Sequence, residues 1–177
     1  IGSLMLGRGR SPFARVICNP EKPGMLFCAH VDGSLSSWRG WQTGKAAFQY
    51  DMVSYNDWSR FNKPSKGKVA VYGLAASPLD PDRVAQLFSD GRVWVWQNRA
   101  ASANVPAHFA LEGALDALHG PLSCQDVSPF CNELSALVAL GTHDGVLQVV
   151  DVLTSNLRFH TKLYDGPVRG VRWLTQH

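Results

Sequence analysis

The stretch VAQLFSDGRVWVW at residues 84–96 places Asp90 and Gly91 between two apolar runs. An Asp-Gly pair in this setting is a strong signal for a β-hairpin, and we expect a two-residue type I′ turn with positive φ at both positions. The run Val93–Trp96 is apolar at every position instead of alternating with polar residues. The sequence therefore predicts a tight hairpin in a sheet that is covered on both faces.

The same arrangement occurs three times along the chain. Each copy has an apolar strand that ends near a proline, a second apolar run, an Asp-Gly turn and a third strand. The turns are Asp32–Gly33, Asp90–Gly91 and Asp144–Gly145, and they lie 58 and 54 residues apart. Repetition on this scale is typical of the four-stranded blades of a β-propeller, so the expected fold is all-β.

The spacing divides the chain into blades at roughly residues 11–68, 69–121 and 122–167, with residues 168–177 opening a fourth copy. Alternating patterns predict outer strands at residues 48–55 and 157–163, whereas residues 100–117 are consistent with either a short helix or an outer strand near Phe109. A closed propeller typically has at least four blades. We therefore interpret the chain, which starts at Ile1 rather than Met, as a propeller fragment that self-associates through uncovered blade faces when isolated.

The composition is that of a globular module with a packed core. Hydrophobic residues make up 45% and charged residues 18% of the 177 residues, and the formal net charge is +3. No apolar run reaches the length of a membrane-spanning helix. The cysteines Cys18, Cys28, Cys124 and Cys131 have no zinc-type spacing. We expect inert core thiols, with Cys18 and Cys28 on buried strands, in a reducing, cytoplasmic compartment.

The repeats resemble the WD repeat, in which a turn Asp, a strand Ser or Thr, a strand Trp and a preceding His can form a buried hydrogen-bond network. Asp90 and Trp96 match this pattern in the second copy. His119 and Asp144 match it in the third copy, where Val150 stands in the place of Trp. The resemblance implies a WD40-type propeller built from divergent repeats. The expected core tryptophans are Trp38, Trp94, Trp96 and Trp173.

Within the WD-repeat family, the order of motifs is similar to that of a large scaffold with two propellers. The similarity covers nearly the whole chain and rests on residues 26–30, 89–93, 137–142 and 168–173. It implies that the chain is the later part of the first propeller. It also implies roles in vesicle trafficking at the trans-Golgi network, ciliogenesis and Hedgehog signalling, with trafficking or tethering-complex subunits as partners. The implied locations are the trans-Golgi network, cytoplasmic vesicles, the cilium base and the nucleus, with membrane association only through partners.

Catalysis is the weaker functional interpretation. Thr142, His143 and Asp144 could suggest acid–base chemistry, as could His30 near Asp32. Both histidines lie at hairpin turns, where the Asp is explained by turn formation, and no Ser or Cys nucleophile can be paired with a base from the sequence. We therefore expect no enzymatic activity, no cofactor, no metal site and no small-molecule substrate.

Nucleic-acid binding is the alternative to a protein scaffold. Residues 7–10 form an Arg-Gly stretch, and Lys63, Lys66 and Lys68 form a second basic cluster. A net charge of +3 is nevertheless ordinary for a solvated surface, and most of the tryptophans fall on packed strands. We therefore expect the partner to be a protein.

The long insert at residues 39–68 is the expected contact surface. A propeller displays loops on rigid blades, and this insert carries aromatic residues and an arginine that could anchor a partner. These candidates are Trp41, Tyr55, Trp58, Arg60 and Phe61. The alternative, that these side chains only cover a blade edge, stays open at this point.

Overall fold

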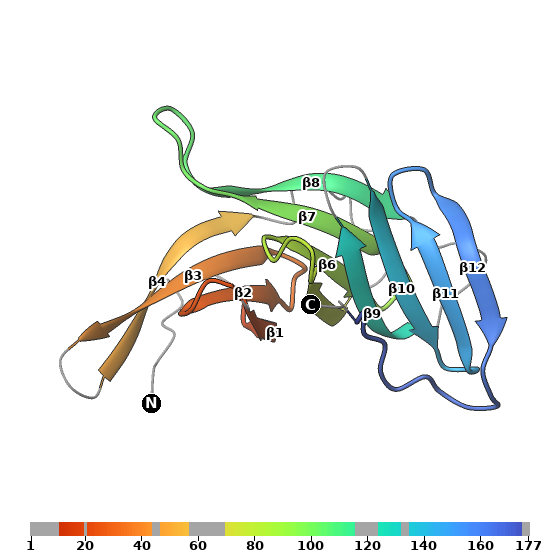
Figure 1. The fold of residues 1–177 in the computed structure, drawn as a ribbon. Helices are drawn as coiled ribbons and strands as arrows, with labels where there is room; N and C mark the ends of the chain where they lie inside the picture. Colours follow the sequence, from red (N-terminus) through yellow and green to blue (C-terminus); the bar gives the residue numbers. More distant parts are fainter. Residues whose placement is uncertain are drawn as a thin grey trace.

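The computed structural model of the protein describes residues 11–19, 21–43, 47–56, 70–115, 124–131 and 135–174. This part of the chain folds into three antiparallel sheets of four consecutive strands, which we call blades 1, 2 and 3 (Figure 1). Blade 1 contains β1 (Phe13–Cys18), β2 (Met25–His30), β3 (Leu35–Thr43) and β4 (Ala47–Asn56). Blade 2 contains β5 (Val71–Ala76), β6 (Arg83–Phe88), β7 (Val93–Arg99) and β8 (His108–Leu115). Blade 3 contains β9 (Cys124–Cys131), β10 (Ala136–Thr142), β11 (Val146–Asp151) and β12 (Asn156–Lys162).

The outer strands follow the sequence patterns. β4 includes residues 48–55, and β12 covers most of residues 157–163, as predicted. For residues 100–117 the sequence allowed a helix or an outer strand, and the structure has the strand: β8 includes Phe109. The described residues contain no helix. The predicted all-β architecture is therefore confirmed.

The Asp-Gly turns differ from the predicted geometry. In blade 1 the Gly33 N–H donates to the His30 carbonyl at 2.9 Å, and the His30 N–H donates to the Ser34 carbonyl at 2.8 Å. Gly33 has a φ of 92°, whereas Asp32 lacks the positive φ that a type I′ turn requires. The prediction of a two-residue turn was wrong: Val31, Asp32 and Gly33 form the loop, and of these only the glycine is left-handed.

The turn aspartates are explained by their side chains. Asp32 Oδ1 accepts the N–H of Ser34 at 3.0 Å, and Asp90 Oδ1 accepts the N–H of Arg92 at 3.3 Å. In blade 3 the Thr142 hydroxyl donates to the carboxylate of Asp144, and this bond holds the pKa of Asp144 below its usual value. A carboxylate that accepts the N–H two residues further on stabilises a turn without a left-handed Asp.

Gly91 offers a test of the turn assignment, because it occupies the left-handed position of the blade 2 turn with a φ of 83°. Replacing Gly91 by Val is expected to lower the free energy of unfolding by about 1–2 kcal/mol, since a β-branched side chain is strained at this φ. Urea or thermal unfolding measures the loss. Gly91→Asn is the control, because Asn tolerates the left-handed region better. Unchanged stability of the Val variant would contradict the assignment.

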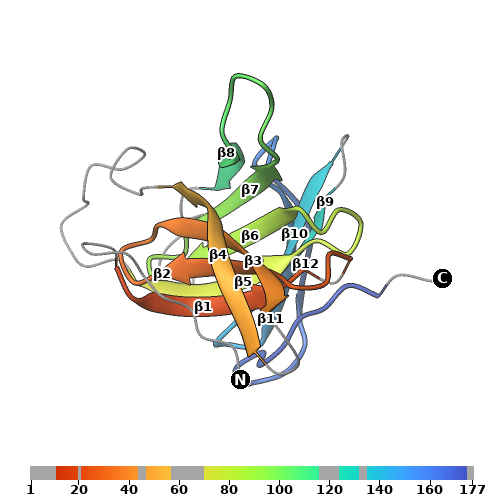
Figure 2. The ribbon, with the colours of Figure 1, turned by 90° about the vertical axis from the view of Figure 1, so that its left-hand side faces the viewer.

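The blades stack in sequence order (Figures 1 and 2). Two apolar cores lie between them. The core between blades 1 and 2 includes Trp94 and Trp96, and the core between blades 2 and 3 includes Val93 and Val95. β7 therefore points its aromatic row toward blade 1 and its valine row toward blade 3. This division explains the uninterrupted apolar run at residues 93–96 and confirms the predicted coverage of both faces.

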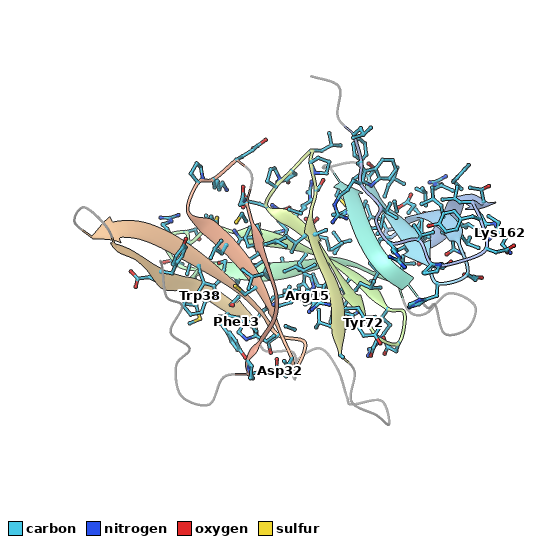
Figure 3. All side chains as sticks on the ribbon, turned by 90° about the horizontal axis from the view of Figure 1, so that it is seen from below. Phe13, Arg15, Asp32, Trp38, Tyr72 and Lys162 are labelled. Atoms are coloured by element: carbon cyan, nitrogen blue, oxygen red, sulfur yellow. The ribbon has the colours of Figure 1, made fainter. Side chains whose placement is uncertain are left out.

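Side chains also form hydrogen bonds across the blade junctions. Arg15 Nε on β1 donates to the Tyr72 carbonyl on β5 at 2.9 Å, and Figure 3 shows both residues on these neighbouring inner strands. Ser77 Oγ donates to the Cys131 carbonyl at 3.0 Å and accepts the Cys131 N–H at 2.9 Å. These bonds fix neighbouring blades relative to each other, so the hairpins at their rims keep a defined spacing.

Residues 163–174 follow β12 without forming a strand. The Val168 N–H donates to the Thr142 carbonyl at 2.8 Å, and the Trp173 ring centroid lies 4.9 Å from that of Phe130 on β9. The segment thus packs beside the inner strand of blade 3, as β9 packs beside β5 and β5 beside β1. This is the place that the sequence analysis assigned to the start of a fourth copy. Trp173, which was expected in the core, is partly exposed there.

Candidate functional site

Blade 1 contains a buried chain of hydrogen bonds that starts at Trp38. The Trp38 Nε1–H donates to Ser36 Oγ at 2.8 Å, and Ser36 Oγ lies 2.8 Å from His30 Nε2. His30 Nδ1 lies 2.6 Å from the Ser11 carbonyl oxygen. Because a carbonyl can only accept, Nδ1 carries the proton and Nε2 accepts from the Ser36 hydroxyl. The relay therefore ties the segment before β1 to β2 and β3.

A Ser–His contact of this length is also the geometry of a nucleophile and its base. Ser36 and His30 are both 0% exposed, however, and the rings of Phe13 and Tyr55 lie 5.1 and 5.3 Å from the His30 ring. A substrate has no access to the Ser36 hydroxyl, so this pair is structural. The pair was not predicted from the sequence, although the spacing of Ser36 and Trp38 places both residues on one face of a strand.

Blade 2 replaces this relay with a glutamine. Trp96 Nε1 donates to Gln86 Oε1 at 3.1 Å, and Gln86 Nε2 donates to the Gly33 carbonyl of blade 1 at 2.8 Å. The strand register places Val150 of blade 3 at the position of Trp96, so that strand has no indole donor. His119, which matched the family pattern for this copy, lies outside the described residues. The expected network is thus present in altered form in blades 1 and 2.

The cysteines differ in exposure. Cys28 and Cys131 are buried, and burial raises the pKa of each thiol to about 12. Cys18 is exposed, so the prediction that it lies on a buried strand was wrong. The reason is that β1 is an edge strand, of which only Ala14 and Ile17 pack against the core between blades 1 and 2. The side chain of Cys124 lies outside the described residues.

Thiol labelling tests this difference. At pH 8 a thiol with a pKa of about 12 is thiolate in only about one molecule in ten thousand. We expect Cys18 to react rapidly with Ellman's reagent in the native protein, and Cys28 and Cys131 to react only after unfolding. The Cys18→Ser variant should lose one equivalent of the rapid reaction. Rapid native labelling of Cys28 or Cys131, located by peptide mass spectrometry, would contradict their burial.

The β3–β4 and β7–β8 hairpins project at one rim of blades 1 and 2 (Figure 1). Residues of both blades line a cleft of about 370 Å³ at this rim. β3 pairs with β2 only as far as Arg39, and beyond this residue it pairs with β4 alone. The β7–β8 hairpin extends through the exposed residues 99–106. The polar lining residues of the cleft are Lys22, Arg39, Asp82, Asn98 and Arg99. The apolar lining residues are Met25, Val53, Ala100, Ala101 and Ala107.

The base of the β3–β4 hairpin is held by a close backbone contact. The Gly40 N–H donates to the Gly24 carbonyl at 2.6 Å. A Cβ on Gly40 would lie 2.6 Å from Tyr50 Cε1, so only glycine allows the Tyr50 ring to cover the backbone at this point. The hairpin is therefore fixed where it leaves the blade, next to Arg39 in the wall of the cleft.

The floor of the cleft is an ordered polar cluster around Asp82. The Asp82 carboxylate pairs with Lys22 and lies 3.4 Å from Asn19 Nδ2 and 3.3 Å from Asn98 Nδ2. Because a carboxylate only accepts, the Asn98 amide nitrogen must face Asp82, which also fixes the position of the Asn98 amide oxygen. This oxygen is buried and has no hydrogen-bond partner among the described residues.

The cleft also carries an excess of positive charge. The described residues that line the cleft include three cationic side chains, Lys22, Arg39 and Arg99, and one carboxylate, that of Asp82, so the lining carries an excess of two positive charges. Arg39 comes from blade 1 and Arg99 from blade 2; both are exposed, and neither forms an ion pair within the described part of the chain. An exposed guanidinium group that is not already in an ion pair binds carboxylates and phosphates well, because its N–H donors match the geometry of these anions.

None of the predicted contact residues is among the described residues that line this cleft. Trp41 lies in the projecting part of β3, two residues beyond Arg39, whereas Tyr55 packs its ring against His30 within blade 1. Trp58, Arg60 and Phe61 lie outside the described residues. Arg39 and Arg99 were not predicted as site residues, because they are 60 residues apart in the sequence and neither belongs to a recognisable motif. Only the stacking of the blades brings them to one cleft.

The described residues hold no candidate metal site and no candidate membrane-spanning helix. Within them, no group of three or more His, Cys, Asp or Glu side chains is placed to hold a metal ion. The same ranges contain no helix with the length and hydropathy needed to cross a membrane. The cleft is therefore the candidate site that the described side chains support best.

Two solved structures share this stacking of four-stranded sheets. The C-terminal WD40 domain of Sif2 matches with a TM-score of 0.58 and 14% identity over 87% of this chain and 38% of that chain. The WD40 repeats of RRP9 match with a TM-score of 0.55 and 13% identity over 90% of this chain and 42% of that chain. The fold is that of WD40 propeller blades.

The chain spans about two fifths of the length of each of these WD40 structures. At such low identity the likeness establishes the WD40 fold and leaves function to be argued from the site. No protein-family model matches the chain, and no curated protein matches it in sequence. In this fold the connecting hairpins are displayed on the rims of rigid blades.

Proposed function

We propose that the chain forms three successive blades of a WD40 interaction scaffold, and that a partner protein binds in the cleft between blades 1 and 2. One observation carries this proposal: two arginines that form no ion pair with the described residues flank an ordered floor, in which the Asn98 amide oxygen accepts no hydrogen bond from those residues. Arginine is enriched among the residues that dominate protein interfaces. The cleft is thus prepared for a ligand that brings both negative charge and hydrogen-bond donors.

Binding fits these side chains better than catalysis. The Ser36–His30 pair is sealed from solvent, and the cleft offers an ion pair and two arginines instead of a poised base next to a nucleophile. The proposed role is therefore non-enzymatic.

The finer proposal concerns the cellular setting. The motif order described above resembles WD repeat-containing protein 11, and by this resemblance we propose that the chain belongs to the first propeller of such a scaffold. The implied functions are vesicle trafficking at the trans-Golgi network, ciliogenesis and Hedgehog signalling, in contact with trafficking or tethering-complex subunits. The corresponding locations are the cytoplasm, the trans-Golgi network, vesicles, the cilium base and the nucleus.

Nucleic-acid binding is the second candidate, because the excess of cations in the cleft would also attract phosphates. A binding titration with random oligonucleotides at increasing salt distinguishes the two candidates. Nucleic-acid binding predicts measurable affinity that falls steeply with salt. The protein-scaffold proposal predicts no binding above that of an unrelated protein with the same net charge.

Cleft variants test the proposed function directly. We expect proteins that co-purify with the wild type from cell lysate to be lost from the double variant Arg39→Gln/Arg99→Gln. The control is Arg169→Gln, which removes an exposed arginine outside the cleft. A photo-crosslinking amino acid at Ala101, in the cleft lining, should join the same partner covalently. Equal recovery with the double variant and the control, or no crosslink at Ala101, would contradict binding in the cleft.

A further inference from the structure

The amide oxygen of Asn98, at the floor of the cleft, accepts no hydrogen bond from the described residues. Asn98 is only 8% exposed. Its backbone N–H donates to the Asp82 carbonyl at 2.8 Å, and its side-chain amide nitrogen donates to the Asp82 carboxylate. The amide oxygen is thus held in place and has no partner among the described residues. A buried acceptor is costly when it stays unsatisfied, so a bound N–H or O–H group at this point would be stabilised.

The walls of the cleft supply binding groups for an anion. Arg39 projects from the β3–β4 hairpin and Arg99 from the start of the β7–β8 hairpin, so a ligand between them would contact both blades. Lys22 is already paired with Asp82, which leaves the two arginines for the ligand. A carboxylate could accept N–H groups from both guanidinium groups at once.

The free C-terminus of a polypeptide offers an anion for the two arginines and a hydrogen-bond donor for Asn98 within one residue. Its carboxylate and the N–H of its last peptide bond are attached to the same Cα atom, so an anion and a donor arrive at a short, fixed spacing. The cleft volume of about 370 Å³ is at the lower end of the roughly 300–1,000 Å³ of ligand sites, which suits a chain end better than a segment that must enter and leave. Met25, Val53 and the three alanines offer apolar contacts for its last side chains.

We propose that the cleft binds the C-terminal end of a partner polypeptide, with its carboxylate between Arg39 and Arg99 and its last backbone N–H donated to Asn98 Oδ1. This inference rests on the proposed function, namely that the cleft binds a protein. It adds the chemical identity of the part that is recognised.

Labelled peptides test the inference on the purified protein. The probes are nineteen fluorescently labelled tetrapeptides, Ala-Ala-Ala-X with a free carboxylate, where X is each of the common amino acids except proline, whose peptide nitrogen carries no N–H. Each is matched by its C-terminal amide and by a form N-methylated at the last peptide bond. An amidated Ala-Asp-Ala-Ala peptide tests an internal carboxylate. We expect at least one free acid to bind, with affinity at least tenfold weaker for its amide, its N-methyl form and the internal-Asp peptide in fluorescence polarisation.

Protein variants locate the binding. Arg39→Gln and Arg99→Gln should each weaken binding of the best free acid at least tenfold, while Arg169→Gln leaves it unchanged, with folding of each variant verified by circular dichroism. Binding by none of the acids, equal binding of the amide or of the internal-Asp peptide, or an equal loss with Arg169→Gln would overturn the inference. If cleft variants lose a cellular partner whose C-terminus proves dispensable, the proposed function stands and this inference fails.

Discussion

Replacing Trp96 by Ala is expected to lower the free energy of unfolding by roughly 3–5 kcal/mol, the usual range for truncating a buried large aromatic side chain. Trp96 is 2% exposed in the core between blades 1 and 2. Its indole N–H also donates to Gln86 Oε1, and Gln86 in turn donates to the Gly33 carbonyl of the neighbouring blade. The substitution therefore opens a cavity and interrupts a polar link between blades. Urea unfolding followed by tryptophan fluorescence and circular dichroism measures the loss.

Two further variants separate these contributions. Trp96→Phe keeps most of the ring but leaves Gln86 Oε1 without its donor, which should cost about 2 kcal/mol. Leu157→Ala truncates a side chain that is 53% exposed and should stay within about 0.5 kcal/mol of the wild type. A loss below about 1 kcal/mol for Trp96→Ala would place this ring at the surface and contradict the packing of the two blades.

Replacing Gly145 by Ala is the second change with a large expected effect, a loss of at least about 3 kcal/mol. Gly145 has a φ of 84°, and a Cβ at this position would lie 1.8 Å from the Tyr164 carbonyl oxygen and 2.8 Å from that of Gly166. Both obstacles are backbone atoms, so the segment after β12 would have to move. This movement would also break the hydrogen bond from the Leu163 N–H to the Gly145 carbonyl, now 2.8 Å long.

Gly91→Ala provides the matched control, because Gly91 has nearly the same φ of 83° in the equivalent turn of blade 2. It should show the cost of the left-handed conformation alone, about 1 kcal/mol. Thermal unfolding of both variants under identical conditions gives the difference. Equal losses would mean that the segment at residues 163–166 does not lie against the blade 3 turn as the structure has it.

The fold could be predicted from the sequence because its signals are local. The Asp-Gly pairs and the apolar runs beside them lie within about a dozen residues, and these are the interactions that determine a hairpin. The turn type was missed for a related reason: Asp32 and Asp90 contribute through their carboxylates, which accept a backbone N–H two residues further on, and not through a left-handed backbone. An Asp-Gly pair in a sequence is compatible with either mechanism.

The candidate site could not be predicted in the same way. Arg39 and Arg99 line one cleft only because two blades stack, and the importance of Asn98 depends on an amide oxygen that accepts no hydrogen bond from the described residues, which no sequence pattern reveals. The exposure of Cys18 likewise depends on the position of β1 at the edge of its sheet. Of the aromatic residues chosen as contacts, Tyr55 contributes to the packing around His30 instead. Apolar character alone does not distinguish a partner anchor from a packed residue.

The two side-chain rows of β7 mean that the blades are not interchangeable modules. The indole rings of Trp94 and Trp96 meet blade 1, while Val93 and Val95 meet a surface of small aliphatic side chains on blade 3. A duplicated blade 2 stacked on itself would press the bulky row of one copy against the valine row of the other, where aliphatic side chains now fit. The order of the blades is therefore encoded in side-chain volume, and a recombination event that shuffled these repeats would require compensating changes on both neighbouring faces.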